Sequence, residues 1–123
     1  MTYIDGFVIP IAKKNLAAYK KMASKGGKIW MKHGALQYVE CVGDDLKSAL
    51  KWKCIPFNTL AKAKRNETVV FSFIVYKSKA HRDSVNAKVM KDPTMAPEQW
   101  KNKPMPFEMK RMAVGGFSSI VKL

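Results

Sequence analysis

Hydrophobic and polar positions alternate with a period of two in several segments of the chain, and apolar residues recur at helical spacing in others. Strands are predicted at residues 3–9, 36–42, 67–77 and within 110–123. One helix is predicted at residues 13–33, with Gly34 as its stop, and another begins after Ser78 as N-cap and ends before Asp92. The order along the chain is therefore strand, helix, strand, strand, helix, strand.

This order predicts an α+β, ferredoxin-like βαββαβ domain, in which a four-stranded antiparallel sheet carries both helices on one face. The 123 residues suffice for a single domain over 1–123 with its own core. Pro10 is expected to close the first strand, and irregular structure is expected at 43–66, with a short helix after Pro56, and at 93–107. Gly26 and Gly27 weaken the first helix, so a close packing contact is expected there.

The two faces of the predicted sheet differ in composition. On the strand at 67–77, a uniformly apolar set is expected to face the helices: Val69, Phe71, Phe73 and Val75. The open face then carries Ser72, Ile74 and Tyr76, together with Tyr3, Phe7 and Phe117. Because so much exposed apolar and aromatic surface needs a partner, we expect a homodimer that pairs sheet against sheet as a dimeric α/β barrel.

The composition, with 47% hydrophobic and 26% charged residues, is that of an ordinary globular protein. The N-terminal residues lack the features of a secretory leader, and no apolar run approaches the roughly 20 residues that span a bilayer. We therefore expect a cytoplasmic protein without membrane contact. Cys41 and Cys54 are predicted to be free thiols, with Cys41 in the core.

Charged residues on the open sheet face are the candidates for a binding site. Strand alternation places Asp5, Glu40 and Arg111 there, among Tyr3, Tyr38 and Tyr76. Inside a dimer barrel this face would line a pocket, where two carboxyl groups beside a cation could bind or deprotonate a small molecule. The alternative is that these groups form an ion pair, or hydrogen bonds to tyrosine hydroxyls, at the dimer interface. His81, at the start of the later helix, would border the same pocket.

No sequence motif identifies a reaction or a cofactor. The chain lacks the GxSxG, HExxH and Walker patterns and a strand-linked GxGxxG. His33 and His81 have no carboxylate or cysteine at ligand spacing, so they do not predict a metal site. We therefore expect no metal and no cofactor, and the sequence leaves open whether the protein is an enzyme.

The charge of the chain points to a second kind of partner. Lys and Arg number 23 against 9 Asp and Glu, and the net charge of +14 attracts phosphates and acidic surfaces. Candidate polyanion contacts are Lys21, Lys25 and Lys28 on one side of the first helix, and Lys51, Trp52 and Lys53, where the indole could stack a base. An RNA- or phosphate-binding module is therefore the alternative function. The simpler explanation is a set of lysine faces that keep the protein soluble.

Long stretches of the chain resemble one known family. The segments HGALQYVECVGDD, VVFSFIVYKSKAHRDSVNAKVMKDP and MPFEMKRMAVGGF are similar to hallmark runs of the YbaA-like family of uncharacterised bacterial proteins (domain of unknown function 1428). The resemblance implies a ferredoxin-like fold and a dimeric α/β-barrel assembly, but the family has no established activity. The leading expectation is a dimer that binds an unknown small molecule in a pocket over the open sheet face, as an enzyme without a cofactor or as a binding protein.

Overall fold

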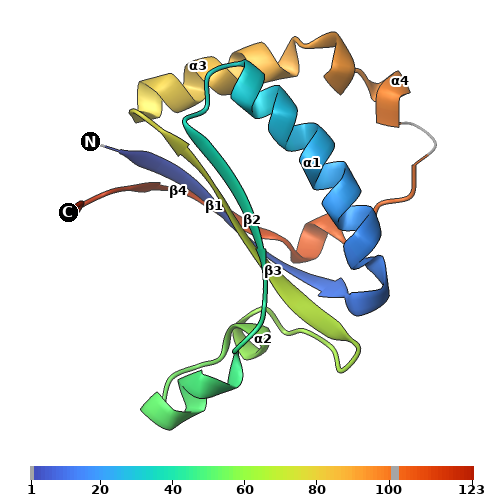
Figure 1. The fold of residues 1–123 in the computed structure, drawn as a ribbon, viewed down its shortest axis with the longest axis vertical. Helices are drawn as coiled ribbons and strands as arrows, with labels where there is room; N and C mark the ends of the chain where they lie inside the picture. The colour runs from blue at the N-terminus through green and yellow to red at the C-terminus, as the bar shows by residue number, and fades with distance from the viewer. Residues whose placement is uncertain (1, 101–102) are drawn as a thin grey trace.

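The computed structural model describes residues 2–100 and 103–123 and contains a four-stranded antiparallel sheet (Figure 1). Its strands are β1 (Tyr3–Ala12), β2 (Gln37–Val42), β3 (Glu67–Tyr76) and β4 (Ala113–Ser118). They lie in the order β2-β3-β1-β4. Helices α1 (Leu16–Lys32) and α3 (Lys79–Met90) cover one side of this sheet. The ferredoxin-like order and topology predicted from the sequence are thus confirmed, and the sheet of one chain is open rather than closed into a barrel.

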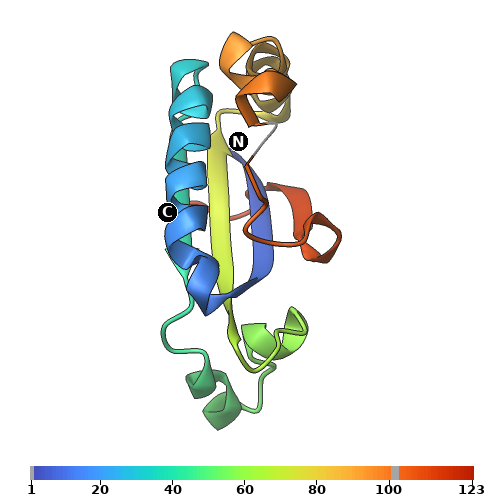
Figure 2. The same cartoon turned by 90° about the vertical axis from the view of Figure 1, so that its right-hand side faces the viewer.

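Shorter elements connect the strands and helices. They are η1 (Lys13–Asn15), η2 (Lys47–Trp52), α2 (Phe57–Leu60), η3 (Pro93–Met95), α4 (Pro97–Trp100) and η4 (Met109–Arg111). The short helix expected after Pro56 is α2. Figure 2 shows the η2 and α2 segment at one end of the strands, well separated from α3 at the other end. The segment at 93–107 was expected to be largely irregular, and its described residues contain the short helices η3 and α4. Residues 101 and 102 lie outside the described residues.

The local signals at the helix ends act as predicted. The Ser78 hydroxyl accepts a hydrogen bond from the His81 N–H at 3.1 Å and so caps α3. Gly34 has φ +110°, a conformation that glycine adopts without steric cost, and it ends α1 after His33.

Pro10 does not close the first strand, and that expectation is wrong. β1 continues to Ala12 and pairs with β3 along its whole length, whereas its pairing with β4 ends at Val8. The Lys13 N–H donates to Asn66 O at 3.0 Å, and the alternation of the ladder then turns the Pro10 nitrogen away from β3. The missing N–H of Pro10 therefore faces the unpaired side of β1, where it breaks no ladder bond.

The face assignment made from the sequence is inverted. Ile74 and Tyr76 are buried against Val85 and Val89 of α3, so this side of β3 faces the helices. Phe71, which was expected to face them, is 43% exposed on the other side. Both alternating sets of β3 are apolar enough to form a core, and the set that contains the tyrosine is buried because its hydroxyl finds a partner beneath the helices.

The side chains of the strand paired with β3 are inverted in the same way. Tyr3 and Phe7 pack against the cluster beneath the helices, and they do not lie on the open face as expected. Phe117 is on the open face, as predicted, because it pairs with Ile4 and lies over Gly6. The open face of the sheet thus carries the side chains of Ile4, Val8, Phe71, Phe73, Val75 and Phe117.

Candidate functional site

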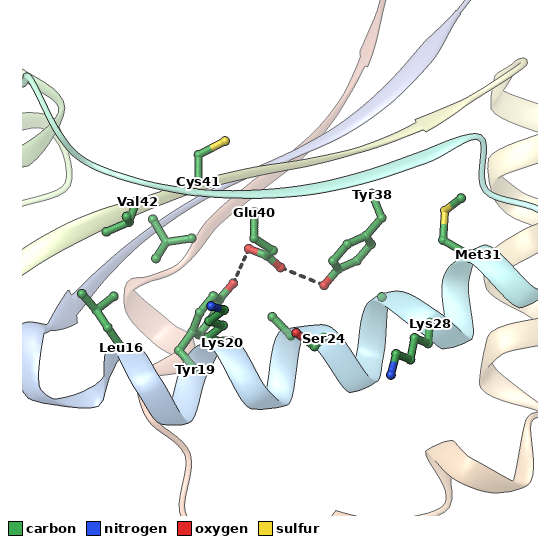
Figure 3. A pocket seen from close by; sticks show the side chains of 13 residues that line it. Leu16, Tyr19, Lys20, Ser24, Lys28, Met31, Tyr38, Glu40, Cys41 and Val42 are labelled. Atoms are coloured by element: carbon green, nitrogen blue, oxygen red, sulfur yellow. Dashed lines mark hydrogen bonds between the residues drawn. The ribbon is translucent and has the colours of Figure 1, made fainter.

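A carboxylate held by two tyrosines lies between α1 and the sheet (Figure 3). Glu40 Oε1 accepts a hydrogen bond from the Tyr19 hydroxyl at 2.7 Å, and Glu40 Oε2 accepts one from the Tyr38 hydroxyl at 2.8 Å. Tyr38 and Glu40 are two positions apart on β2, so strand alternation points both toward α1, and Tyr19 rises from α1 to meet them. These three residues are called the tyrosine–glutamate bridge below.

A glycine of α1 makes the bridge sterically feasible. A Cβ added to Gly27 would lie only 2.7 Å from the Tyr38 ring, so the ring packs directly against the helix backbone. A Cβ added to the neighbouring Gly26 would have nothing within 4 Å. The close contact expected at this glycine pair is therefore confirmed at Gly27 and absent at Gly26.

The two tyrosines of the bridge are held in their neutral form. Burial raises the pKa of both hydroxyls far above its usual value, and the Glu40 carboxylate raises it further. Tyr19 and Tyr38 therefore act as hydrogen-bond donors at physiological pH. Glu40 is the acceptor of both hydrogen bonds.

Two cavities meet at the bridge, and Tyr19, Ala23, Tyr38 and Glu40 line both of them. The outer cavity, of about 820 Å³, lies between α1 and β2 and is drawn in Figure 3. Besides the shared residues, its walls include Leu16, Lys20, Lys28, Met31, Val42 and Val70. Cys41 also borders it, but its side chain points away from α1 and is exposed, so the expectation of a core cysteine is wrong.

The inner cavity, of about 410 Å³, lies on the other side of the bridge, between the sheet, α1 and the segment after α3. Aromatic and thioether side chains dominate its lining, among them Met22, Trp30, Met95, Phe107, Met109 and Met112. Methionine is flexible and polarisable, so such a wall adapts to differently shaped apolar molecules.

Asp5, a candidate pocket residue, belongs to a separate polar cluster. Its carboxylate is buried and pairs with Arg82 of α3, whose Nη1 lies 2.7 Å from Asp5 Oδ1. Burial raises the pKa of Asp5, and the neighbouring guanidinium opposes the rise. Arg82 also lies over the Tyr3 ring, at 5.0 Å from its centroid. The ion pair foreseen as the alternative for Asp5 thus exists, but within one chain and with a cation that the sequence did not indicate.

Tyr76 contributes to the same cluster rather than to a cavity. It is fully buried, and its hydroxyl donates to Asn86 Oδ1 at 3.4 Å, beside the Trp30 indole N–H that donates to the same oxygen at 3.1 Å. Burial raises the pKa of Tyr76 to about 12, with the Asp5 charge adding to the effect. Tyr3, Asp5 and Tyr76 share one face of the sheet, as predicted, but that face lies under α3 and not on the open side.

Arg111 is not near either carboxylate with which it was grouped. Its guanidinium pairs with Glu67 at the start of β3, with Nη1 2.7 Å from Oε2 and Nη2 2.8 Å from Oε1. This bidentate ion pair lowers the pKa of Glu67 to about 2. The grouping failed because Arg111 lies in η4, before β4 begins, where strand alternation does not apply.

The two histidines have structural partners. His81 Nδ1 accepts the Lys77 N–H at 2.9 Å, and its ring packs at 81° to the Tyr76 ring. His81 lines neither the outer nor the inner cavity. His33 Nε2 lies 2.6 Å from the buried Asp92 carboxylate, which also accepts from Thr94. Within residues 2–100 and 103–123, no three His, Cys, Asp or Glu side chains gather as a metal site would require.

The candidate polyanion residues lie in two separate places. Lys21, Lys25 and Lys28 line a groove of about 660 Å³ on the outer side of α1, together with Lys20. Lys25 Nζ lies 4.6 Å from the centre of the Trp100 ring, and the nearby Lys103 lowers the pKa of Lys25. Lys51, Trp52 and Lys53 are in and just after η2, where Trp52 is 79% exposed, and they do not line this groove.

Sequence reasoning missed Tyr19 and Arg82. Tyr19 sits in the apolar stripe of α1, and the available signal was that a buried tyrosine needs an acceptor for its hydroxyl. Arg82 lies in the first turns of α3, and the sequence analysis gave it no role. Its partner Asp5 is 77 positions away in the chain, and no periodic pattern indicates such a pair.

Comparisons with known proteins match the chain to one family and to one solved structure. The model of a family described as "Protein of unknown function (DUF1428)" matches residues 2–109. The chain is 42% identical over 121 residues to the uncharacterised protein YbaA of Escherichia coli K12, with 98% of each chain covered, and equally similar to YbaA of Shigella flexneri. A crystal structure described as a dimeric ferredoxin-like protein from an uncultured marine organism aligns over 100% of both chains, with TM-score 0.59 and 10% identity.

No helix among the described residues is long and apolar enough to cross a membrane.

The match to the family model and the identity to YbaA over nearly the full length of both chains establish the relationship indicated by the sequence runs. The chain therefore belongs to the DUF1428 family of proteins of unknown function.

Proposed function

We propose that the protein is a homodimer that binds a small, largely apolar organic molecule in the cavities between α1 and the sheet, with Glu40 as its polar contact. The observation that carries this proposal is the tyrosine–glutamate bridge in the shared wall of two cavities. This placement replaces the earlier hypothesis of a pocket over the open sheet face.

The size and lining of the cavities support a small-molecule ligand. Pockets for such ligands typically enclose about 300–1,000 Å³, with mostly apolar walls and a few polar groups that fix orientation. The outer cavity of about 820 Å³ and the inner cavity of about 410 Å³ fall within this range. Glu40 and the two tyrosines of the bridge are the polar groups that line both cavities.

The hydrogen bonding of Glu40 leaves room for a ligand. A carboxylate offers about four acceptor positions. The hydroxyls of Tyr19 and Tyr38 occupy one position on each oxygen and fix the orientation of the group. A ligand N–H or O–H would fill a remaining position. Should the protein catalyse a reaction, Glu40 is the group of the bridge that would accept a proton from the ligand.

The open face of the sheet supports the dimer. Phe71 is 43% and Phe117 is 61% exposed there, which is unfavourable for a face left in water. The solved structure with the same fold is described as dimeric. A second copy whose sheet packs on this face would cover both residues and form the dimeric α/β barrel.

Fluorescence titration with N-phenyl-1-naphthylamine, an apolar probe with one N–H donor, tests the ligand site. We expect the wild-type protein to bind it and Glu40→Gln to weaken binding by about fivefold, since a neutral acceptor replaces a charged one. Glu98→Gln changes the charge equally at an exposed position of α4 outside both cavities and should leave binding unchanged. A wild-type protein that does not bind the probe, or equal affinity in Glu40→Gln, would refute the site.

Light scattering after size exclusion tests the dimer, with the mass expected to be twice the 13.9 kDa of one chain. Phe117→Glu places a charge on the open face and should yield monomers. Met90→Glu is the matched control, because Met90 on α3 is 64% exposed, close to the 61% of Phe117, but lies away from that face. A monomeric wild-type protein, or a dimer that survives Phe117→Glu, would contradict the proposed interface.

A further inference from the structure

Two lysines of α1 stand at the edge of the outer cavity. Lys20 and Lys28 are eight positions apart on one helix and both line this cavity, with Ser24 between them (Figure 3). Eight residues of helix correspond to about 12 Å between the backbone positions of the two lysines, and their long, flexible side chains can turn toward one acidic group from both sides. Both side chains are exposed.

Neither lysine is neutralised by the protein. The ion pairs of the described residues involve Lys32, His33, Arg82 and Arg111, and Lys20 and Lys28 take part in none of them. Glu40, the nearby carboxylate, is occupied by the two tyrosines instead. The edge of the outer cavity therefore carries unpaired positive charge above apolar walls.

The facing walls are apolar. Leu16 and Met31 of the α1 side and Val42 and Val70 of the sheet line the same cavity. A ligand that fits this arrangement has an apolar body for these walls and an acidic group for the lysines.

We infer that the ligand of the outer cavity is an organic acid, with its carboxylate or another acidic group at Lys20 and Lys28, its apolar body between α1 and β2, and a hydrogen-bond donor on Glu40. This inference rests on the proposed function and narrows it to a chemical class.

A nucleic acid fits the same lysines less well. Base stacking would need an accessible aromatic face beside the groove on α1. Trp100 is covered by Lys25 and approached by Lys103, at 4.6 Å and 5.9 Å from its ring centre, and its indole N–H donates to Thr94 O. The exposed Trp52 lies in η2 and not at this groove.

A pair of matched probes tests the inference. 8-Anilinonaphthalene-1-sulfonate has the same aromatic body and N–H donor as N-phenyl-1-naphthylamine but adds an acidic group. At low salt we expect the wild-type protein to bind the sulfonate about tenfold tighter than the neutral probe, as two charge contacts would give. In the double variant K20Q/K28Q this preference should fall to about twofold or less.

The control is the double variant K21Q/K25Q. It removes the same net charge, and both residues line the groove on α1, but neither lines the outer cavity. The preference for the sulfonate should therefore survive in this variant. Urea unfolding of both variants verifies that they are folded, which we expect because all four lysines lie at least partly exposed on one helix.

Each outcome separates the inference from the proposed function. If both probes bind with equal affinity, the proposed ligand site stands, but the inference that its ligand is an organic acid is wrong. Equal loss of preference in K20Q/K28Q and K21Q/K25Q would show a general effect of the basic groove and would also overturn the inference. If a single-stranded oligonucleotide competes with the sulfonate in the wild-type protein, and K21Q/K25Q abolishes this competition together with sulfonate binding, the lysines serve a polyanion instead. Binding of neither probe would refute the proposed function and the inference together.

Discussion

The adjacent glycines of α1 offer a sharp test of the packing that holds the tyrosine–glutamate bridge. Gly26→Ala and Gly27→Ala make the same chemical change at neighbouring helical positions. In a helix interior the change from glycine to alanine is favourable by about 1 kcal/mol, because glycine loses more backbone freedom on folding. At Gly26 the new methyl group has nothing within 4 Å, so we expect the free energy of unfolding to rise by about this amount.

At Gly27 the same gain is opposed by a steric clash. The added Cβ would lie 2.7 Å from two carbon atoms of the Tyr38 ring and 3.2 Å from Cγ, the ring atom nearest the backbone. The ring cannot swing away easily, since its hydroxyl is bonded to Glu40. Overpacking of this kind costs about 1–3 kcal/mol. The Gly27→Ala protein should therefore be less stable than Gly26→Ala by about 1–3 kcal/mol.

Urea unfolding and thermal melting of the two variants measure this difference. For a domain of this size, 1 kcal/mol corresponds to a shift in Tm of about 3–6 °C. The double variant with Tyr38→Ala supplies the control, because removal of the ring should abolish the penalty at position 27. Equal stability of the two single variants, or a penalty that persists without the ring, would refute the close contact between α1 and Tyr38.

Two ion pairs give further predictions. The pKa of Glu67 is lowered to about 2, so its pair with Arg111 stabilises the protein above the unfolded pKa near 4.5. This stabilisation is lost as the pH falls from 4.5 toward 2. Urea unfolding should show this loss in the wild-type protein and almost none of it in Arg111→Ala. Arg82→Met should destabilise the protein by about 3 kcal/mol at pH 7, because it leaves the Asp5 charge buried without a partner. Because the pKa of Asp5 is raised in the folded protein, the penalty of Arg82→Met should shrink as pH falls and Asp5 takes up a proton, and Asp5→Asn in the same chain should recover part of the stability. A pH-independent penalty in Arg82→Met would contradict the assignment.

The sequence predicts the order of elements well because each is a local property. The branched and aromatic run of β3, the Ser78 cap and the Gly34 stop act within a few residues. Local signals do not determine which side of the sheet the helices cover. Both alternating sets of β3 are apolar enough to form a core, and the choice depends on hydrogen-bond partners for buried tyrosines such as Tyr19 and Tyr76, which come from other elements.

The candidate site was predicted only in part for the same reason. Tyr38 and Glu40 were grouped correctly, since they share one face of one strand. Tyr19, which completes the bridge, comes from α1, and Arg82, which pairs with Asp5, comes from α3. The inner cavity depends on methionines that follow α3 in a segment without a regular period, such as Met109 and Met112, so its existence could not be read from any pattern.

The methionines provide the most direct measurement of the central claim, that a small molecule binds beside Glu40. Met31 borders the outer cavity, Met22 and Met112 border the inner one, and Met90 lies exposed on α3. In a protein labelled with ¹³C at the methionine methyl groups, titration with N-phenyl-1-naphthylamine should shift the signal of Met31, or those of Met22 and Met112, and leave Met90 unchanged. If none of the cavity methionines shifts while the probe binds, the ligand site lies elsewhere and the account is wrong.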